Sequence, residues 1–183
     1  MIRLAGDNVS RMLEQQWLEN VRNGCVYVPG FVSDEWSQLI TMTLRGLRDV
    51  QRIEFIIDCD KGGYNNCFDP CREILWRNGN GKETSAVVVG KAASIGLSYC
   101  VACTHRSAYS DAEFMWHGEM IRAGEKHESG VYLEDHYAAD WMARFTNRTY
   151  DEWAEFASDG RYHEFGPEQA LEWGVIDEIQ EVV

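Results

Sequence analysis

The chain has 183 residues, 45% of them hydrophobic, which predicts one folded domain over residues 1–183 and excludes a disordered chain. Its formal charge of −13 at pH 7 would repel nucleic acid and anionic membranes, so we exclude both as partners. No apolar run has the length of a membrane span, and residues 1–10 lack the apolar segment of a secretory signal. Six cysteines do not make a disulfide scaffold in a chain of this length, so we expect a reduced, cytoplasmic protein.

Hydrophobic spacing predicts helices and strands in alternation along the chain. In the first half we expect a helix at 9–22, a strand at 25–32, a helix opened by Ser33, a strand at 53–59, a helix at about 66–77, a strand at 87–89 and a helix from about Ser94. In the second half we expect a turn at 108–111, a short strand at 113–117, a helix at 131–146, a helix at 149–156 with Thr149 as its cap, a helix at 167–174 and a strand at 175–179.

This alternation predicts an α/β fold with a largely parallel sheet. In such folds, ligands bind at the carboxyl ends of the strands. The pair Gly62-Gly63, the residue Ser94 and the residue His117 all lie at or just after the end of a predicted strand. We therefore expect these groups on one edge of the sheet.

The stretch from Val87 to Gly96 combines a buried strand, a turn of small residues and the start of a helix. Ser94 lies where the turn becomes the helix, so its hydroxyl would be at the positive end of the helix dipole. Backbone N–H groups of the first helical turn have no internal partner there and could face a developing oxyanion. The pattern favours a serine nucleophile. The alternative is that Ser94 is only the N-cap of the helix.

Four motifs occur in a characteristic order: Lys61-Gly-Gly63, Gly90-Lys-Ala-Ala-Ser-Ile-Gly96, Phe114-Met-Trp-His117, and the segment 167–177. Together they resemble the proteolytic subunit of the ATP-dependent Clp protease, the ClpP family of the crotonase-like superfamily. The resemblance extends over residues 11–179. It implies a fold of repeated strand-strand-helix units around a mainly parallel sheet, with a helical handle at about 118–146.

The resemblance also implies roles for individual residues. Ser94 would be the nucleophile, His117 its general base, and the N–H groups of Gly63 and Ile95 the oxyanion hole. This set is chemically coherent, because a serine hydroxyl needs a base to attack and the tetrahedral intermediate needs aimed donors. The implied activity is a serine endopeptidase that acts on peptides or unfolded proteins and needs no cofactor or metal.

The implied assembly is a homo-oligomer, a heptameric ring that encloses its active sites and is fed by an AAA+ unfoldase. In the family, the handle joins two such rings face to face. Here the segment from His117 to Thr146 is shorter than usual, and residues 123–130 are charged. A single ring and a double ring both remain open.

The third member of the triad is the least defined, because its place depends on the direction of counting. Counting forward from Asn147 leads to Gly160, next to Asp159, whereas counting back from Gly174 leads to Tyr162. We predict that Asp159 orients His117. The alternatives are that Asp159 only ends the helix from Thr149 in an Asp-Gly turn, or that the third member is absent.

Other functions stay open as alternatives. The chain could be a catalytically inactive ring scaffold or regulatory subunit, or a viral capsid-maturation protease. A crotonase-type enzyme acting on acyl-CoA thioesters is disfavoured by the pair Ser94 and His117, because such enzymes typically use carboxylates. The spacing of Cys100, Cys103 and His105, with Cys67 and Cys71 nearby, is also compatible with zinc binding. We expect these cysteines to be apolar packing residues instead.

Overall fold

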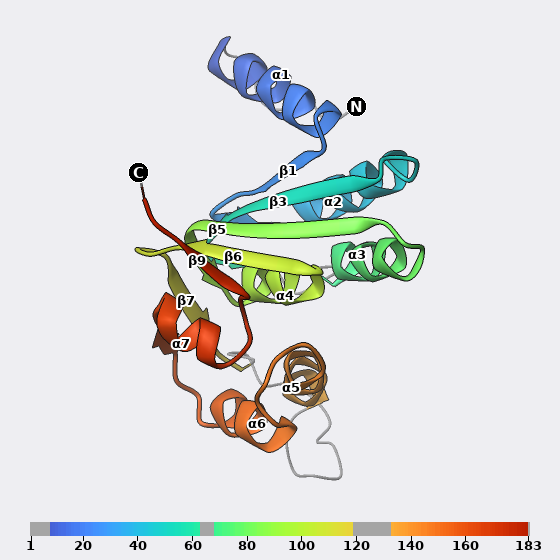
Figure 1. Ribbon diagram of the computed structural model, residues 1–183. Coiled ribbons are helices and arrows are strands. Elements are labelled where there is room, and N and C mark those ends of the chain that lie inside the picture. Colours follow the sequence, from blue (N-terminus) through green and yellow to red (C-terminus); the bar gives the residue numbers. More distant parts are fainter. Residues whose placement is uncertain (1–7, 63–67, 119–132, 183) are drawn as a thin grey trace.

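The computed structural model describes residues 8–62, 68–118 and 133–182. A mainly parallel sheet forms its centre (Figure 1). The strands of this sheet are β1 (Cys25–Val28), β3 (Arg52–Cys59), β5 (Glu83–Ala93), β6 (His105–Tyr109), β7 (Glu113–Trp116), β8 (His163–Phe165) and β9 (Glu178–Gln180). A separate two-stranded parallel sheet joins β2 (Phe31–Val32) to β4 (Lys61–Gly62). The predicted α/β class with a largely parallel sheet is confirmed.

The main path of the sheet has the strand order β1-β3-β5-β6-β9, and every pair on it is parallel. The long strand β5 pairs with β6 through its first half and with β7 through its last residues. Strand β8 pairs with β7 in the antiparallel direction. The end of β5 is therefore held between β3 and β7, and this is the edge where Ser94 and His117 follow.

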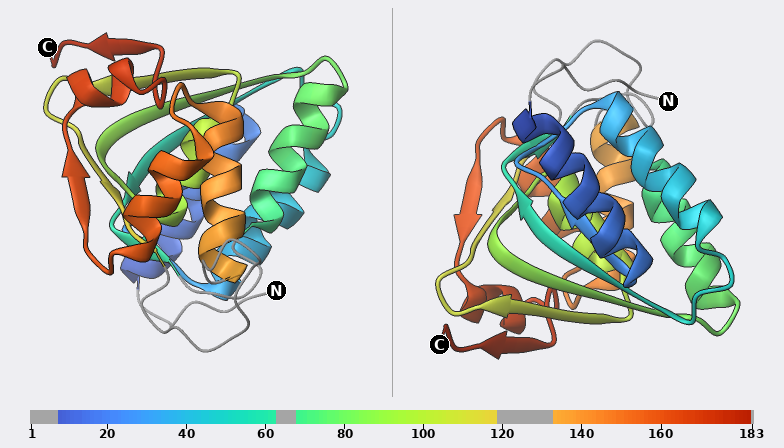
Figure 2. Two further views of the ribbon diagram at one scale, coloured as in Figure 1. Left: turned by 90° about the horizontal axis from the view of Figure 1, so that it is seen from below. Right: turned by 90° about the horizontal axis from the view of Figure 1, so that it is seen from above.

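Seven helices are assigned in the described ranges: α1 (Asn8–Arg22), α2 (Asp34–Gly46), α3 (Asp69–Gly79), α4 (Ile95–Ala102), α5 (Leu133–Phe145), α6 (Tyr150–Ser158) and α7 (Pro167–Glu172). Helices α2, α3 and α4 cover one face of the sheet, and α1 projects away from it (Figure 1). Helices α5 and α6 lie side by side (Figure 2). No helix in the described part of the chain has the length and apolar character needed to cross a membrane.

The hydrophobic core lies between the sheet and α4. On β3, the residues Ile53, Phe55, Ile57 and Cys59 alternate with more exposed ones and are fully buried. All eight residues of α4 are buried, as expected for a helix that is apolar on every side. Because α4 begins directly after Ser94, the core fixes the position of this turn.

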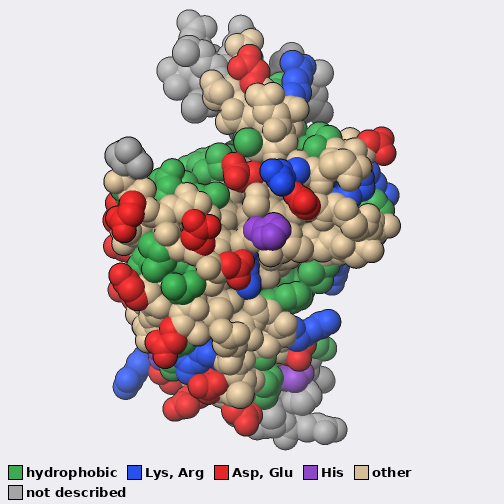
Figure 3. All heavy atoms as spheres, in the orientation of Figure 1, with side chains coloured by type: hydrophobic (Ala, Val, Ile, Leu, Met, Phe, Trp, Pro, Cys, Tyr) green, Lys and Arg blue, Asp and Glu red, His purple; other side chains and the backbone are tan. Residues whose placement is uncertain are grey.

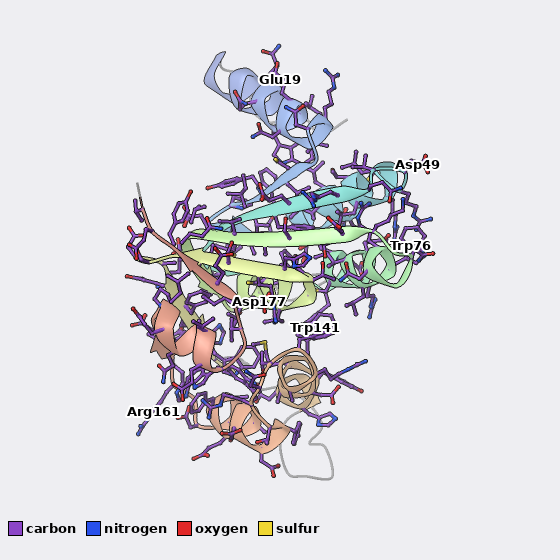
Figure 4. All side chains as sticks on the ribbon, viewed as in Figure 1. Glu19, Asp49, Trp76, Trp141, Arg161 and Asp177 are labelled. Atoms are coloured by element: carbon purple, nitrogen blue, oxygen red, sulfur yellow. The ribbon has the colours of Figure 1, made fainter. Side chains whose placement is uncertain are left out.

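Helix α5 is joined by a hydrogen bond to the middle of this core helix. The indole N–H of Trp141 donates to the carbonyl oxygen of Ser98 over 3.4 Å, and the Trp141 ring contacts Phe68 edge-on. Figure 4 shows Trp141 between the two helices. Of the segment 118–146, predicted as a handle, residues 118 and 133–146 are described, and Leu133–Phe145 form α5. The segment 119–132 lies outside the described residues.

Several predicted boundaries differ from the structure. The strand expected at 25–32 is divided between β1 and β2, because Pro29 lacks the N–H that would continue the ladder. The helix expected from about 66 begins at Asp69. Strand β5 is longer than its apolar centre at 87–89, and β6 occupies part of the predicted turn at 108–111. Strand β8 was not predicted, and the last strand is shorter than 175–179.

The face of the sheet that α2, α3 and α4 leave uncovered carries side chains of mixed charge (Figure 3). A shallow hollow on this face is lined by Arg52, Glu54, Glu83, Thr84, Ser85 and His105. These residues lie at the amino ends of β3, β5 and β6, whereas Ser94 follows the carboxyl end of β5. The hollow is therefore separate from the predicted site.

Candidate active site

Ser94 occupies the turn at which β5 ends and α4 begins. Its φ is 53° and its ψ is −111°, and it is the one non-glycine residue in the described ranges with a positive φ. Its N–H donates to the carbonyl oxygen of Met115 in β7 over 2.9 Å, which fixes the turn to the sheet. Strained backbone of this kind at a strand-to-helix turn is typical of serine nucleophiles, because it presents the Oγ.

The Ser94 hydroxyl does not cap α4. In the same molecule, Ser33 accepts a hydrogen bond from the Trp36 N–H, and Thr149 accepts one from the Glu152 N–H. Ser94 holds the equivalent position before α4 but makes no such side-chain bond. Within the described ranges its hydroxyl makes no hydrogen bond, and the residue is half-buried. The side-chain cap weighed for Ser94 is therefore not observed.

The first residue of α4 packs against the predicted oxyanion region. A Cβ added to Gly62 would collide with Cγ2 of Ile95 and lie 3.2 Å from its Cβ, so only glycine permits this approach. The Ile95 N–H has no intrahelical acceptor and lies at the positive end of the helix. It can therefore donate to an oxyanion formed at Ser94. The second predicted donor, Gly63, lies outside the described residues.

His117 follows β7 and leaves the sheet at the same edge as Ser94. The parallel register pairs Ala93 with Met115, which places the two residues just beyond neighbouring strand ends. The His117 ring contacts Tyr162 edge-on, with 5.3 Å between the ring centroids. In the described part of the chain, no hydrogen bond joins His117 to the Ser94 hydroxyl. In enzymes without substrate, such catalytic hydrogen bonds are often long and tighten only in the complex.

The Nδ1 atom of His117 already has a hydrogen-bond partner. This atom lies 2.5 Å from the carbonyl oxygen of Gly118, the next residue. A protonated Nδ1 donates to this carbonyl and leaves the lone pair on Nε2. This is the tautomer that a general base for Ser94 requires.

Asp159 is engaged by a different histidine. It is the C-cap of α6, and one carboxylate oxygen lies 2.8 Å from the Arg161 N–H and 3.0 Å from Nε2 of His163. Burial alone would raise the pKa of Asp159, but the hydrogen bonds from His163 and Arg161 outweigh it and lower this pKa. No hydrogen bond to His117 is found among the described residues. Gly160 follows with a φ of 74°, so the segment forms the Asp-Gly turn weighed as the alternative.

The cysteines weighed as zinc ligands lie in the core. Burial raises the pKa of Cys100 to about 12 and that of Cys103 well above its ordinary value, so both are thiols at neutral pH. In the described ranges, no group of three or more His, Cys, Asp or Glu side chains could hold a metal ion. Cys67 lies outside these ranges.

Two residues beside His117 were not singled out from the sequence. A Cβ on Gly118 would collide with the Ala157 carbonyl and lie 2.6 Å from Oδ1 of Asp135. Asp135 is 1% exposed. A signal for it exists in the helical spacing, because it precedes the fully buried Ala139 and Met142 by four and seven residues. Asp135 thus lies on the apolar face of α5, where a carboxylate is unexpected.

The chain was compared with known proteins. No protein-family model matches it, and a search of curated proteins found no match. The resemblance to the Clp proteolytic subunit therefore depends on the motifs of this sequence, and the roles assigned from it are proposals.

Proposed function

We propose that this chain is a serine peptidase of the Clp proteolytic-subunit type, with the ClpP/crotonase-like fold, that cleaves peptides or unfolded proteins. The observation that carries the proposal is the backbone of Ser94. Holding a non-glycine residue at positive φ costs on the order of 1–3 kcal/mol, and the hydroxyl gives no capping bond in return. A strained turn with an uncommitted hydroxyl is what a serine nucleophile requires.

The mechanism is acyl transfer. Ser94 Oγ attacks the scissile carbonyl carbon while its proton passes to Nε2 of His117, which later gives that proton to the leaving amine. The tetrahedral oxyanion accepts hydrogen bonds from the N–H groups of Ile95 and Gly63. One such donor is typically worth about 3 kcal/mol in the transition state. Water then hydrolyses the acyl-enzyme with His117 as base again.

The proposal extends to assembly and location. A peptidase of this type encloses its sites in a heptameric ring, single or stacked, that receives unfolded chains from an AAA+ unfoldase in the cytoplasm. Mass photometry at micromolar protein concentration tests the ring. A particle of seven, or twice seven, 21.0 kDa chains is expected, whereas a monomer contradicts the enclosed chamber.

Hydrolysis of a small fluorogenic peptide tests the chemistry. Ser94→Ala removes the nucleophile and is expected to lower kcat by at least about a thousandfold, while the melting temperature stays close to that of the wild type. Ser33→Ala is the matched control, because it removes a capping hydroxyl from α2 and should leave kcat unchanged. Equal hydrolysis by the wild type and Ser94→Ala would contradict the serine-peptidase mechanism.

A second candidate is the inactive ring scaffold or regulatory subunit. Two observations favour it: His117 makes no hydrogen bond with the Ser94 hydroxyl in the described ranges, and Asp159 is bound to His163. The same assay separates the candidates. A scaffold would form the ring and show no more hydrolysis than its Ser94→Ala variant.

A further inference from the structure

The side chain that lies against the proposed base is that of Tyr162. Its ring meets the His117 ring edge-on, with 5.3 Å between the centroids and 69° between the planes. The strand register accounts for this contact. Trp116 pairs with His163 where β7 and β8 run antiparallel, so the next residues, His117 and Tyr162, leave the ladder opposite each other. Counting back from Gly174 along the sequence also leads to Tyr162 as the third position of the triad.

One carboxylate fixes the backbone on both sides of Tyr162. Asp159 accepts a hydrogen bond from the Arg161 N–H over 2.8 Å and lies 3.0 Å from Nε2 of His163. These two partners are the residues that flank Tyr162 in the chain. The His163 ring also stacks on Phe156 of α6, with 4.1 Å between the centroids. Tyr162 therefore has a defined place beside α6, although it is 59% exposed.

A hydrogen bond at Nδ1 alone leaves an imidazole free to pivot about that bond. The Gly118 carbonyl binds Nδ1 of His117 and selects the tautomer with a free Nε2, but it does not fix the direction in which Nε2 points. A second contact on the ring removes this freedom. Among the residues that the structure describes, Tyr162 supplies the one aromatic ring in contact with the imidazole.

We propose that Tyr162 is a positioning residue for His117 and limits its ring to orientations from which Nε2 can reach Ser94; this inference rests on the peptidase function proposed above. A tyrosine ring carries no net charge, so it orients the base without the negative charge that an aspartate would supply. The two duties of the third triad member are thus divided. The Gly118 carbonyl sets the tautomer, and Tyr162 sets the orientation.

Steady-state kinetics on the assembled protein provide the first test. Tyr162→Ala is expected to lower kcat about tenfold or more and to leave KM within about twofold, because a misdirected base slows the chemistry but not substrate binding. Tyr162→Phe keeps the ring and should stay within about twofold of the wild type in both constants. A higher KM at unchanged kcat in Tyr162→Ala would indicate a substrate contact and overturn the inference. Unchanged kinetics, or equal losses in the two variants, would overturn it as well.

Tyr137 on α5 offers a matched control. It is 61% exposed, and its ring lies beside a different histidine, His136, with 5.5 Å between the centroids. Tyr137→Ala makes the same chemical change at a similar exposure and should leave kcat within about twofold of the wild type. A loss of kcat in Tyr137→Ala equal to that in Tyr162→Ala would contradict a specific role of Tyr162.

A second readout needs no turnover and so separates this inference from the proposed function. Diethyl pyrocarbonate acylates the free nitrogen of neutral histidine, and peptide mass spectrometry gives the rate for His117 alone. This rate should rise severalfold in Tyr162→Ala, because one side of the imidazole is uncovered, and stay unchanged in Tyr162→Phe. An unchanged rate in Tyr162→Ala would overturn the inference even in an active enzyme. A raised rate in a protein whose wild type hydrolyses no peptide would support the contact and contradict the peptidase function.

Discussion

The amino termini of α4 and α6 begin with the same kind of residue and use it in opposite ways. At α6, Thr149 has a φ of −75° and exchanges hydrogen bonds with Glu152 in a capping box. At α4, Ser94 has a φ of 53° and makes no side-chain cap bond. The Thr149 hydroxyl forms hydrogen bonds with the first turn of its helix, whereas the strained turn keeps the Ser94 hydroxyl from doing so. The backbone conformation, more than the residue type, separates the capping hydroxyl of Thr149 from the hydroxyl that we propose as the nucleophile.

The starts of the two helices also differ in burial. Thr149 is exposed, and so are Asp151 and Glu152 in the first turn of α6. By contrast, α4 is buried along its whole length, and its first residue packs on Gly62. The N–H groups at the start of α4 are therefore held rigidly at the edge of the core, as an oxyanion hole requires.

Ser94→Gly is expected to have the largest effect, because it should lower peptide hydrolysis and raise the free energy of unfolding. Hydrolysis falls by at least about a thousandfold because the nucleophile is lost. The free energy of unfolding rises by about 1 kcal/mol, since glycine adopts positive φ without strain. Urea denaturation measures this difference, with Ser94→Ala as the control that loses activity without the gain. A Ser94→Gly protein less stable than Ser94→Ala would contradict the account of strain.

Thr149→Ala is expected to give the smaller and simpler effect. Losing the cap should lower the free energy of unfolding by about 1 kcal/mol. Peptide hydrolysis should remain within about twofold of the wild type, because Thr149 touches none of the proposed catalytic groups. Urea denaturation and the same peptide assay measure both quantities. Loss of hydrolysis at unchanged stability would show that α6 contributes to the site directly.

Local sequence patterns were enough to predict the elements whose residues pack with nearby neighbours. The apolar runs of β3 and β5 and the cap at Thr149 were all readable in this way. Strand β6 was not, because His105 and Arg106 are polar. It pairs with β5 and β9, and its Arg106 side chain binds the distant Asp177 and the carbonyl of Phe145. No local pattern encodes such contacts.

The candidate site also combines residues that local patterns predict with residues that they do not. Ser94 and His117 were predictable because they lie in short motifs at the ends of neighbouring strands. The third position was not, because the two counts disagreed over the segment after Asp159. In the structure this segment turns at Gly160 and forms β8 against β7. The close approach of α5 and α6 to Gly118, where an added Cβ would meet Asp135 and Ala157, is also not revealed by sequence spacing alone.

The central claim is that the Ser94 hydroxyl is an activated nucleophile, and covalent labelling tests it most directly. A fluorophosphonate probe, followed by peptide mass spectrometry, is expected to give one adduct per wild-type chain on Ser94 and none on Ser94→Ala. Labelling should be lost in His117→Ala, because a serine without its base reacts poorly. A wild-type protein that stays unlabelled, or one that is labelled at the same rate after Ser94→Ala, would contradict the claim.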